Sequence, residues 1–120
     1  MLTLPCSVRI FVSVEPTDMR CSFDRLAAMA QTILGQDPLS GHLFVFFNRY
    51  HDRCKILFWD RTGFCLWYKR LEEGVFRLPH HSSTKCFEMD MAKLTLILEG
   101  IDLCSAHQRK RFVLQHVKSQ

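Results

Sequence analysis

The spacing of apolar residues predicts a helix over residues 23–34. The apolar side chains recur at intervals of three and four residues, which places them on one face of a helix. They are Phe23, Leu26, Ala27, Ala30, Ile33 and Leu34. Ser22, or Asp18 one turn earlier, is suited to cap the N-terminus of this helix. Gly35 is suited to end it, and Pro38 prevents its continuation.

Runs of β-branched and aromatic residues predict strands before and after this helix. They are Val8–Val14, His42–Asn48, Lys55–Asp60 and Phe64–Arg70. The gaps between the last three runs are short enough for hairpins, and Asp60-Arg61-Thr62-Gly63 suits a type I turn closed by a glycine bulge. Val75–Leu78 is predicted as a further short strand.

A second helical stripe follows a polar loop at Pro79–Lys85. It consists of Met91, Leu94, Thr95, Leu98 and Ile101, with Asp90 near its start and Gly100 near its end. The element order is therefore β-α-β-β-β-(β)-α. Consecutive hairpins require antiparallel pairing, and amphipathic helices need a surface to cover. We predict an α+β fold, an antiparallel β-sheet of about four or five strands with two helices.

The chain length of 120 residues suits one domain. We expect this domain to span residues 1–104 and to be followed by a basic, flexible tail at residues 105–120. The sequence shows no signal peptide and no run of 18 apolar residues, so we expect a cytoplasmic protein without a membrane span. The net charge of +4 permits nucleic-acid binding without requiring it.

The cysteines raise the question of a metal site or of disulfides. They are Cys6, Cys21, Cys54, Cys65, Cys86 and Cys104. No two of them form the C-x-x-C pair of common zinc sites, so we expect free, mostly buried thiols and no metal or other cofactor. The alternative is zinc held by His80, His81 and Cys86, for which a matching second pair of ligands is missing.

The hairpin of residues 55–70 contains the main candidates for a nucleic-acid-binding surface. If Asp60 pairs with Phe64 across a three-residue turn, one face of the sheet carries the four side chains of Lys55, Trp59, Trp67 and Lys69. Aromatic rings between lysines are typical of a nucleic-acid-binding surface, because bases stack on the rings and phosphates contact the ammonium groups. The alternative, that both tryptophans are core and both lysines extend to solvent, is favoured because large aromatic residues are mostly buried.

Further candidates for phosphate contacts lie at the preceding hairpin tip, at the end of the last predicted hairpin strand and near the C-terminus. They are Arg49, Arg53, Arg70, Arg109, Lys110 and Arg111. A run of charges is more often only a solvated face, so these residues are candidates by position and charge alone.

Several ungapped motifs, in order along the chain, carry a specific resemblance. They are Glu15-Pro16-Thr17-Asp18-Met19-Arg20, Phe23-Asp24-Arg25-Leu26, Asp37–Phe46, Lys55–Glu72 and Leu98–Asp102. Over about residues 2 to 103, the chain resembles the TnpB-type accessory proteins of IS66-type bacterial insertion sequences. The larger RNA-guided nuclease that shares the name TnpB is unrelated.

The resemblance implies a non-catalytic role in transposition. Such proteins are encoded between two other reading frames of a mobile element, and the larger neighbouring product carries the transposase chemistry. The expected partners are the transposase and the other small protein of the element, and the resemblance offers no catalytic residues. Cys21 and the region of Cys54 depart from a pattern that is commonly more basic. Such departures weaken DNA binding if the basic residues touch DNA elsewhere in the family.

Two rival functions fit the element order poorly. A transposase-like metal site needs converging carboxylates on a fold that opens with three strands, and the predicted order does not provide one. The available acids are Asp18, Asp24, Asp60, Glu88 and Asp90. An RNA-recognition domain is echoed by Ile10-Phe11-Val12 and Gly41–Phe47, but Gln36–Ser40 leaves no room for a strand that this fold requires.

Two function classes therefore remain. In the first, the protein binds duplex DNA through the region of Arg49, Arg53, Lys55 and Lys69, or acts as a general module for RNA or single-stranded DNA through an aromatic and basic sheet face. In the second, it is an assembly factor that binds the transposase, the other small protein or a second copy of itself. The net charge slightly favours DNA, and the hairpin that is apolar on both sides favours a protein partner or a homodimer slightly more.

Overall fold

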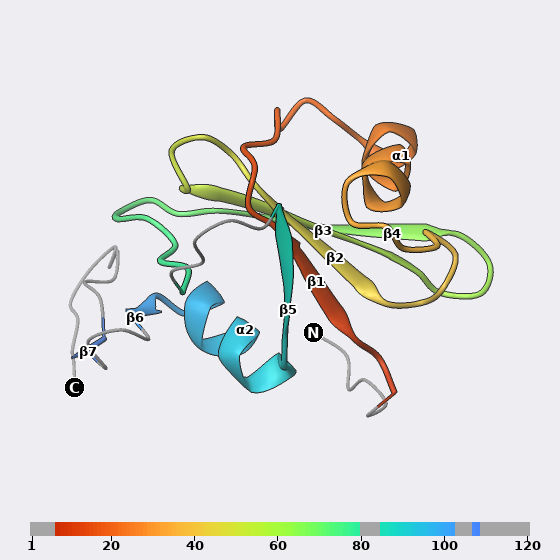
Figure 1. Ribbon diagram of the computed structural model, residues 1–120. Helices are drawn as coiled ribbons and strands as arrows, with labels where there is room; N and C mark the ends of the chain where they lie inside the picture. The colour runs from red at the N-terminus through yellow and green to blue at the C-terminus, as the bar shows by residue number, and fades with distance from the viewer. Residues whose placement is uncertain (1–6, 80–84, 103–106, 109–120) are drawn as a thin grey trace.

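The computed structural model describes residues 7–79, 85–102 and 107–108. A five-stranded sheet lies between two helices, one on each face (Figure 1). The elements of this part are β1 Ile10–Ser13, α1 Phe23–Thr32, β2 Leu43–Phe47, β3 Arg53–Trp59, β4 Phe64–Arg70, β5 Cys86–Met89 and α2 Met91–Leu98. Ile101–Asp102 and His107–Gln108 form a separate two-stranded sheet, β6 and β7. No helix in these ranges is long and apolar enough to cross a bilayer.

The strand order in the large sheet is β4-β3-β2-β1-β5. The pairs β4–β3, β3–β2 and β1–β5 are antiparallel, and β1 with β2 is parallel. The predicted α+β fold with a sheet of four or five strands and two helices is confirmed, and the predicted antiparallel pairing holds for three of the four strand pairs. The one parallel pair was not predicted. It arises because α1 carries the chain from the end of β1 back to the edge at which β1 began.

The fifth strand is β5, and the prediction of a strand at Val75–Leu78 is wrong. Phe76 is only 2% exposed, so its apolar character serves the core and not strand pairing. In β5, Cys86–Met89 pairs along β1, and Glu88 forms an ion pair with Arg9 at 2.8 Å. Four residues directly before a helix are too short for a period of two to be recognised.

Each helix buries one stripe against its own face of the sheet. The α1-side core contains Phe11, Leu26, Ala30, Leu34, Phe44, Phe46 and Leu57. The α2-side core contains Ile10, Val12, Leu43, Val45, Phe47, Cys54, Ile56, Phe76, Met89, Leu94, Ile97 and Leu98. All five residues of β2 are buried, because both of its faces are covered. The apolar side chains on both faces of the hairpin of β3 and β4 thus largely pack within the chain.

The helix ends largely follow the sequence. The Asp90 carboxylate caps α2 by accepting the backbone N–H of Lys93 at 2.8 Å, and Gly100 follows with φ +87°. Gly35, with φ +67°, ends α1 in a conformation that side chains rarely adopt. Ser22 occupies the N-cap position of α1, but its hydroxyl makes no capping hydrogen bond.

Candidate nucleic-acid interface

The pairing of β3 with β4 decides which cations share a face of the sheet. Trp59 pairs with Phe64 across a four-residue loop, and Lys55 pairs with Tyr68. The predicted register, with Asp60 opposite Phe64, is therefore wrong by one residue. Asp60 belongs to the loop, where its carboxylate accepts two backbone N–H groups. Because side chains alternate along a strand, this shift moves every β4 side chain to the opposite face.

The corrected register separates the four side chains predicted to share a face. Lys55 and Trp59 lie on the face covered by α1, whereas Trp67 and Lys69 lie on the face covered by α2. Trp67 packs against the α2-side core, and Trp59 meets Phe64 edge-on with ring centroids 5.1 Å apart. The platform of two tryptophans and two lysines does not form.

Lys55 is buried and already has polar partners. Its Nζ donates to the carbonyl oxygens of Met19 and Cys21, each at 2.7 Å, and lies 4.8 Å from the ring centroid of Tyr68. The residue is 7% exposed. Lys55 therefore fixes the segment before α1 against β3, which leaves little of the side chain to reach a phosphate.

Lys69 also binds a backbone carbonyl instead of extending freely to solvent. Its Nζ donates to the Leu98 carbonyl oxygen at 2.8 Å, at the last residue of α2. Carbonyl groups at a helix C-terminus carry partial negative charge, so a cation there is favourable. Both hairpin lysines thus have structural partners that their place in the sequence did not predict.

The turn between β2 and β3, residues 48–52, is held by a dense local network. The side-chain oxygen of Asn48 accepts the backbone N–H groups of Asp52 and Arg53, both at 3.0 Å. Its amide nitrogen donates to the Asp52 carboxylate at 2.6 Å. His51 adopts φ +57°, and its ring stacks on Phe47 at 5.8 Å. We call this turn the β2–β3 tip.

Distant segments also support the β2–β3 tip. The backbone N–H of Phe76 donates to the His51 carbonyl at 2.7 Å, and that of Leu71 donates to the Asp52 carbonyl at 2.7 Å. The Phe76 ring lies 5.5 Å from the Phe47 ring. The side chains at this tip are therefore presented from a fixed backbone.

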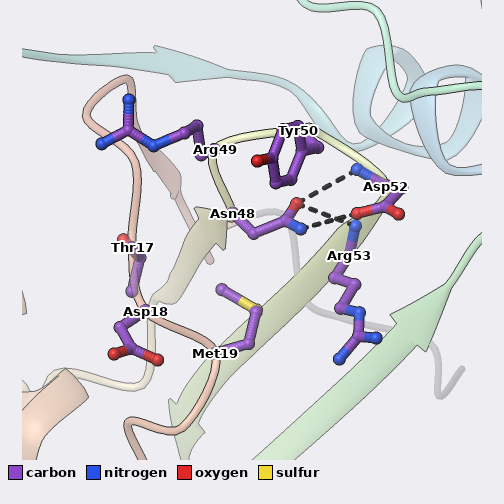
Figure 2. A pocket seen from close by; sticks show the side chains of 8 residues that line it. All are labelled: Thr17, Asp18, Met19, Asn48, Arg49, Tyr50, Asp52 and Arg53. Atoms are coloured by element: carbon purple, nitrogen blue, oxygen red, sulfur yellow. Dashed lines mark hydrogen bonds between the residues drawn. The ribbon is translucent and has the colours of Figure 1, made fainter.

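An open pocket of about 410 Å³ lies between the β2–β3 tip and the loop before α1 (Figure 2). Its lining residues are Thr17, Asp18, Met19, Asn48, Arg49, Tyr50, Asp52 and Arg53. Tyr50 is 74% exposed, and Arg49 is exposed without an ion pair among the described residues. Arg53 is half-buried, with its Nη1 3.3 Å from the Tyr68 hydroxyl. Two guanidinium groups and an aromatic ring thus border one opening.

A second pocket of about 380 Å³ adjoins the first and shares Asp18 with it. Its other lining residues are Arg20, Cys21, Ser22 and Arg25. Arg20 binds the Asp18 carboxylate at 2.7 Å, and this hydrogen bonding lowers the pKa of Asp18 to about 2. Four arginines and two aspartates line the two pockets. Because the arginines outnumber the aspartates by two, the surface favours an anion such as phosphate.

The remaining predicted site residues lie apart from these pockets. Arg70 pairs with Glu72 at 3.1 Å. The basic run at residues 109–111, Arg109-Lys110-Arg111, lies outside the described residues. Sequence reasoning missed Tyr50, Arg20 and Arg25. Tyr50 has a sequence signal, since it stands between two arginines in a hairpin loop, whereas only the fold brings Arg20 and Arg25 beside that loop.

Four of the five candidate carboxylates have separate structural partners. Hydrogen bonding from the Cys65 thiol is the main cause that lowers the pKa of Asp60, and the ion pair with Arg9 lowers the pKa of Glu88. Asp90 caps α2. In the described ranges, no group of three His, Cys, Asp or Glu side chains is placed to hold a metal ion.

The described cysteines are free thiols, namely Cys21, Cys54, Cys65 and Cys86. The expectation that most are buried is wrong for them, since only Cys54 is buried and the other three are half-buried. Burial raises the pKa of the Cys54 thiol and, together with the neighbouring Asp60, that of Cys65. His80 and His81, the histidines of the zinc alternative, lie outside the described residues.

Comparison with known proteins gives one family and two bacterial relatives. The model of the family described as IS66 Orf2-like protein matches residues 8–108. The uncharacterized protein y4hO of Sinorhizobium fredii is 38% identical over 102 residues, which cover 85% of this chain and 88% of that one. The uncharacterized protein y4jC of the same organism is 33% identical over 95 residues, covering 79% and 80%. No solved structure matches the chain significantly.

Proposed function

Because the chain belongs to the IS66 Orf2-like family of insertion-sequence accessory proteins, we propose that it assists transposition as a non-catalytic DNA-binding factor. The observation that carries this proposal is the pair of arginines formed by Arg49, in the fixed β2–β3 tip, and Arg53, directly after it. Guanidinium groups bind phosphate oxygens in a planar geometry, and a prearranged backbone reduces the entropy lost on binding.

The proposal moves the DNA contact from the central hairpin to the β2–β3 tip. The ammonium groups of Lys55 and Lys69 donate to backbone carbonyls, so they are less available to bind a phosphate. Arg49 has no ion pair in the described part of the chain, and Arg20 and Arg25 extend the same basic surface. Such a surface attracts the DNA backbone regardless of base sequence.

Fluorescence anisotropy of labelled duplexes across a salt series tests this function. One duplex carries the terminal repeat of the insertion sequence, and a second carries the scrambled repeat. We expect affinity to fall steeply with salt, and Arg49→Gln and Arg53→Gln each to reduce the slope of log K against log salt by about 0.9. Arg61→Gln is the matched control, since Arg61 is exposed in the loop at the other end of β3.

Each result separates the proposal from its rivals. Preference for the repeat supports a role at the ends of the element, whereas equal affinity for both duplexes indicates a general nucleic-acid-binding module. Equal loss of slope in Arg49→Gln and Arg61→Gln contradicts a site at the β2–β3 tip. Absence of salt-dependent binding rules out the DNA-binding function.

A second candidate function is assembly through β4, an edge of the sheet. In the described part of the chain β4 pairs only with β3, and the stretch Phe64–Tyr68 contains no charge and no proline. An unprotected edge of this kind favours pairing with another strand. Antiparallel pairing of two copies about Leu66 places Phe64 of one copy beside Tyr68 of the other and keeps the cations at the ends of β4 apart. We therefore propose a second copy of the chain as the partner of this edge.

Sedimentation velocity and hydrogen exchange test the assembly role together. A dimer paired through β4 predicts slow amide exchange at alternate residues of this strand, and protection that rises with protein concentration. A monomer at all concentrations, with fast exchange at these amides, would contradict self-pairing.

A further inference from the structure

Tyr50 is the most exposed large hydrophobic side chain of the described residues, yet it stands in a turn whose neighbouring residues are held by hydrogen bonds. The residue on its C-terminal side, His51, has φ +57°, and its carbonyl accepts the backbone N–H of Phe76 at 2.7 Å. Asn48 closes the turn with three side-chain hydrogen bonds. A fixed turn that displays an aromatic ring to solvent is suited to bind a flat partner with little loss of entropy.

The neighbours of Tyr50 indicate the chemistry of that partner. Arg49 precedes it, and both Arg49 and Arg53 line the same pocket (Figure 2). A ring between two cations matches a nucleic-acid strand, in which flat bases alternate with phosphates. Inside a closed duplex every base is covered by its neighbours, so an exposed tyrosine at a narrow tip finds a free base face only at a duplex end or where a base is unpaired.

We propose that Tyr50 stacks on an unpaired base of a DNA strand while Arg49 and Arg53 contact the phosphates on either side of that base. This inference rests on the proposed DNA-binding function and names its ligand as DNA with a single-stranded end or an opened segment. Asp52 lies between Tyr50 and Arg53 in the sequence, and its carboxylate accepts a hydrogen bond from Asn48. In the described ranges this carboxylate forms no ion pair with either arginine.

Three labelled DNAs that share one duplex sequence test the proposal by fluorescence anisotropy at fixed salt. The first is blunt, the second ends in a short overhang of thymidines, and the third has an overhang of the same length built from abasic sugars. The abasic overhang keeps the phosphates and removes the bases, so it isolates stacking from charge. For the unaltered protein we expect the thymidine overhang to bind about ten-fold more tightly than the abasic one.

Substitutions at Tyr50 assign that preference to its ring. Tyr50→Phe keeps the ring and should keep the preference, whereas Tyr50→Ala should bind the two overhangs equally. Phe23→Ala is the matched control, because Phe23 is a 42% exposed aromatic residue outside the pocket lining. This control should retain the full preference.

The outcomes distinguish the inference from the function on which it rests. The role of Tyr50 is overturned if the unaltered protein binds both overhangs equally, or if the preference survives Tyr50→Ala. In either case, salt-dependent binding to the duplex would still support the DNA-binding function. Failure to bind any of the three DNAs overturns both. Loss of preference in Tyr50→Ala alone, with Tyr50→Phe and Phe23→Ala unaffected, supports the stacking site.

Discussion

The two hairpin loops at the ends of β3 contain similar residues and differ in what supports them. The β2–β3 tip has an exposed arginine, Arg49, and a left-handed residue, His51. The loop between β3 and β4, residues 60–63, has Arg61, which is both exposed and left-handed at φ +86°. In each loop a side chain, Asn48 or Asp60, accepts two backbone N–H groups.

The difference lies in contacts with distant parts of the chain. The β2–β3 tip receives hydrogen bonds from Leu71 and Phe76 and a ring contact through Phe47. Among the described residues, the hydrogen bonds of residues 60–63 link that loop only to its own hairpin. Local residues are thus sufficient to reverse the chain, whereas tertiary support turns one reversal into a fixed display of side chains.

Removal of the support beneath the β2–β3 tip should have the largest effect. Phe76→Ala deletes a ring that is 2% exposed and contacts Phe47, so we expect the free energy of unfolding to fall by about 3–5 kcal/mol. Urea denaturation followed by circular dichroism measures this loss. A loss below about 1 kcal/mol would mean that the tip does not depend on Phe76.

Removal of the local network should cost less. Asn48→Ala takes away the acceptor of two backbone N–H groups and the donor to Asp52, and we expect a loss of about 2 kcal/mol. The same denaturation experiment applies. Asn48→Asp, which keeps the acceptor, should recover part of the loss, and an equal loss in both variants would contradict a capping role for Asn48.

Relief of backbone strain should stabilise the loop that lacks distant support. Arg61→Gly places the most permissive residue at φ +86°, and we expect a gain of about 0.5–1 kcal/mol in the free energy of unfolding. His51→Gly is the comparison, since it relieves φ +57° but also deletes the ring stacked on Phe47. We expect this variant to be less stable than the unaltered protein. Equal gains in both variants would remove the distinction between the two loops.

The smallest effect concerns Asp18 beside the β2–β3 tip. Its pKa is about 2 in the folded chain, below the ordinary value of 3.8, chiefly because of the hydrogen bonds from Arg20. A depressed pKa means that the stabilisation is complete above about pH 4 and is lost as the pH falls toward 2. NMR titration of Arg20→Gln should show the Asp18 pKa rising toward 3.8 while that of Asp60 stays unchanged. An unchanged Asp18 pKa in this variant would exclude Arg20 as the cause of its depression.

Periodicity was sufficient to predict both helices and four of the five strands in the large sheet. The register of β4 was not predictable, because Asp60 suits both a three-residue and a four-residue loop, and either choice leaves apolar residues on both faces. The strand β5 is only four residues long. Phe76 lies in an apolar stretch that resembles a strand, but its side chain packs in the core.

The candidate site was predictable only in part. Arg49 and Arg53 were identified by charge in a hairpin loop, and they line one pocket. Lys55 and Lys69 looked equally suitable, but their partners are carbonyl groups of Met19, Cys21 and Leu98 that are distant in sequence. Such contacts depend on packing between elements, which a pattern along the chain does not contain.

The position of β1 within the sheet has a consequence for how the chain folds. Among the described strands β1 comes first in the sequence, yet it lies between β2 and β5, and both of its neighbours come later. The β2–β3–β4 meander joins strands that are close in sequence, so we expect it to form early, whereas β1 must wait for its long-range partners. During synthesis the sheet therefore closes only when Cys86–Met89 has left the ribosome, and a chain that stops before β5 leaves one side of β1 open to pair with another molecule.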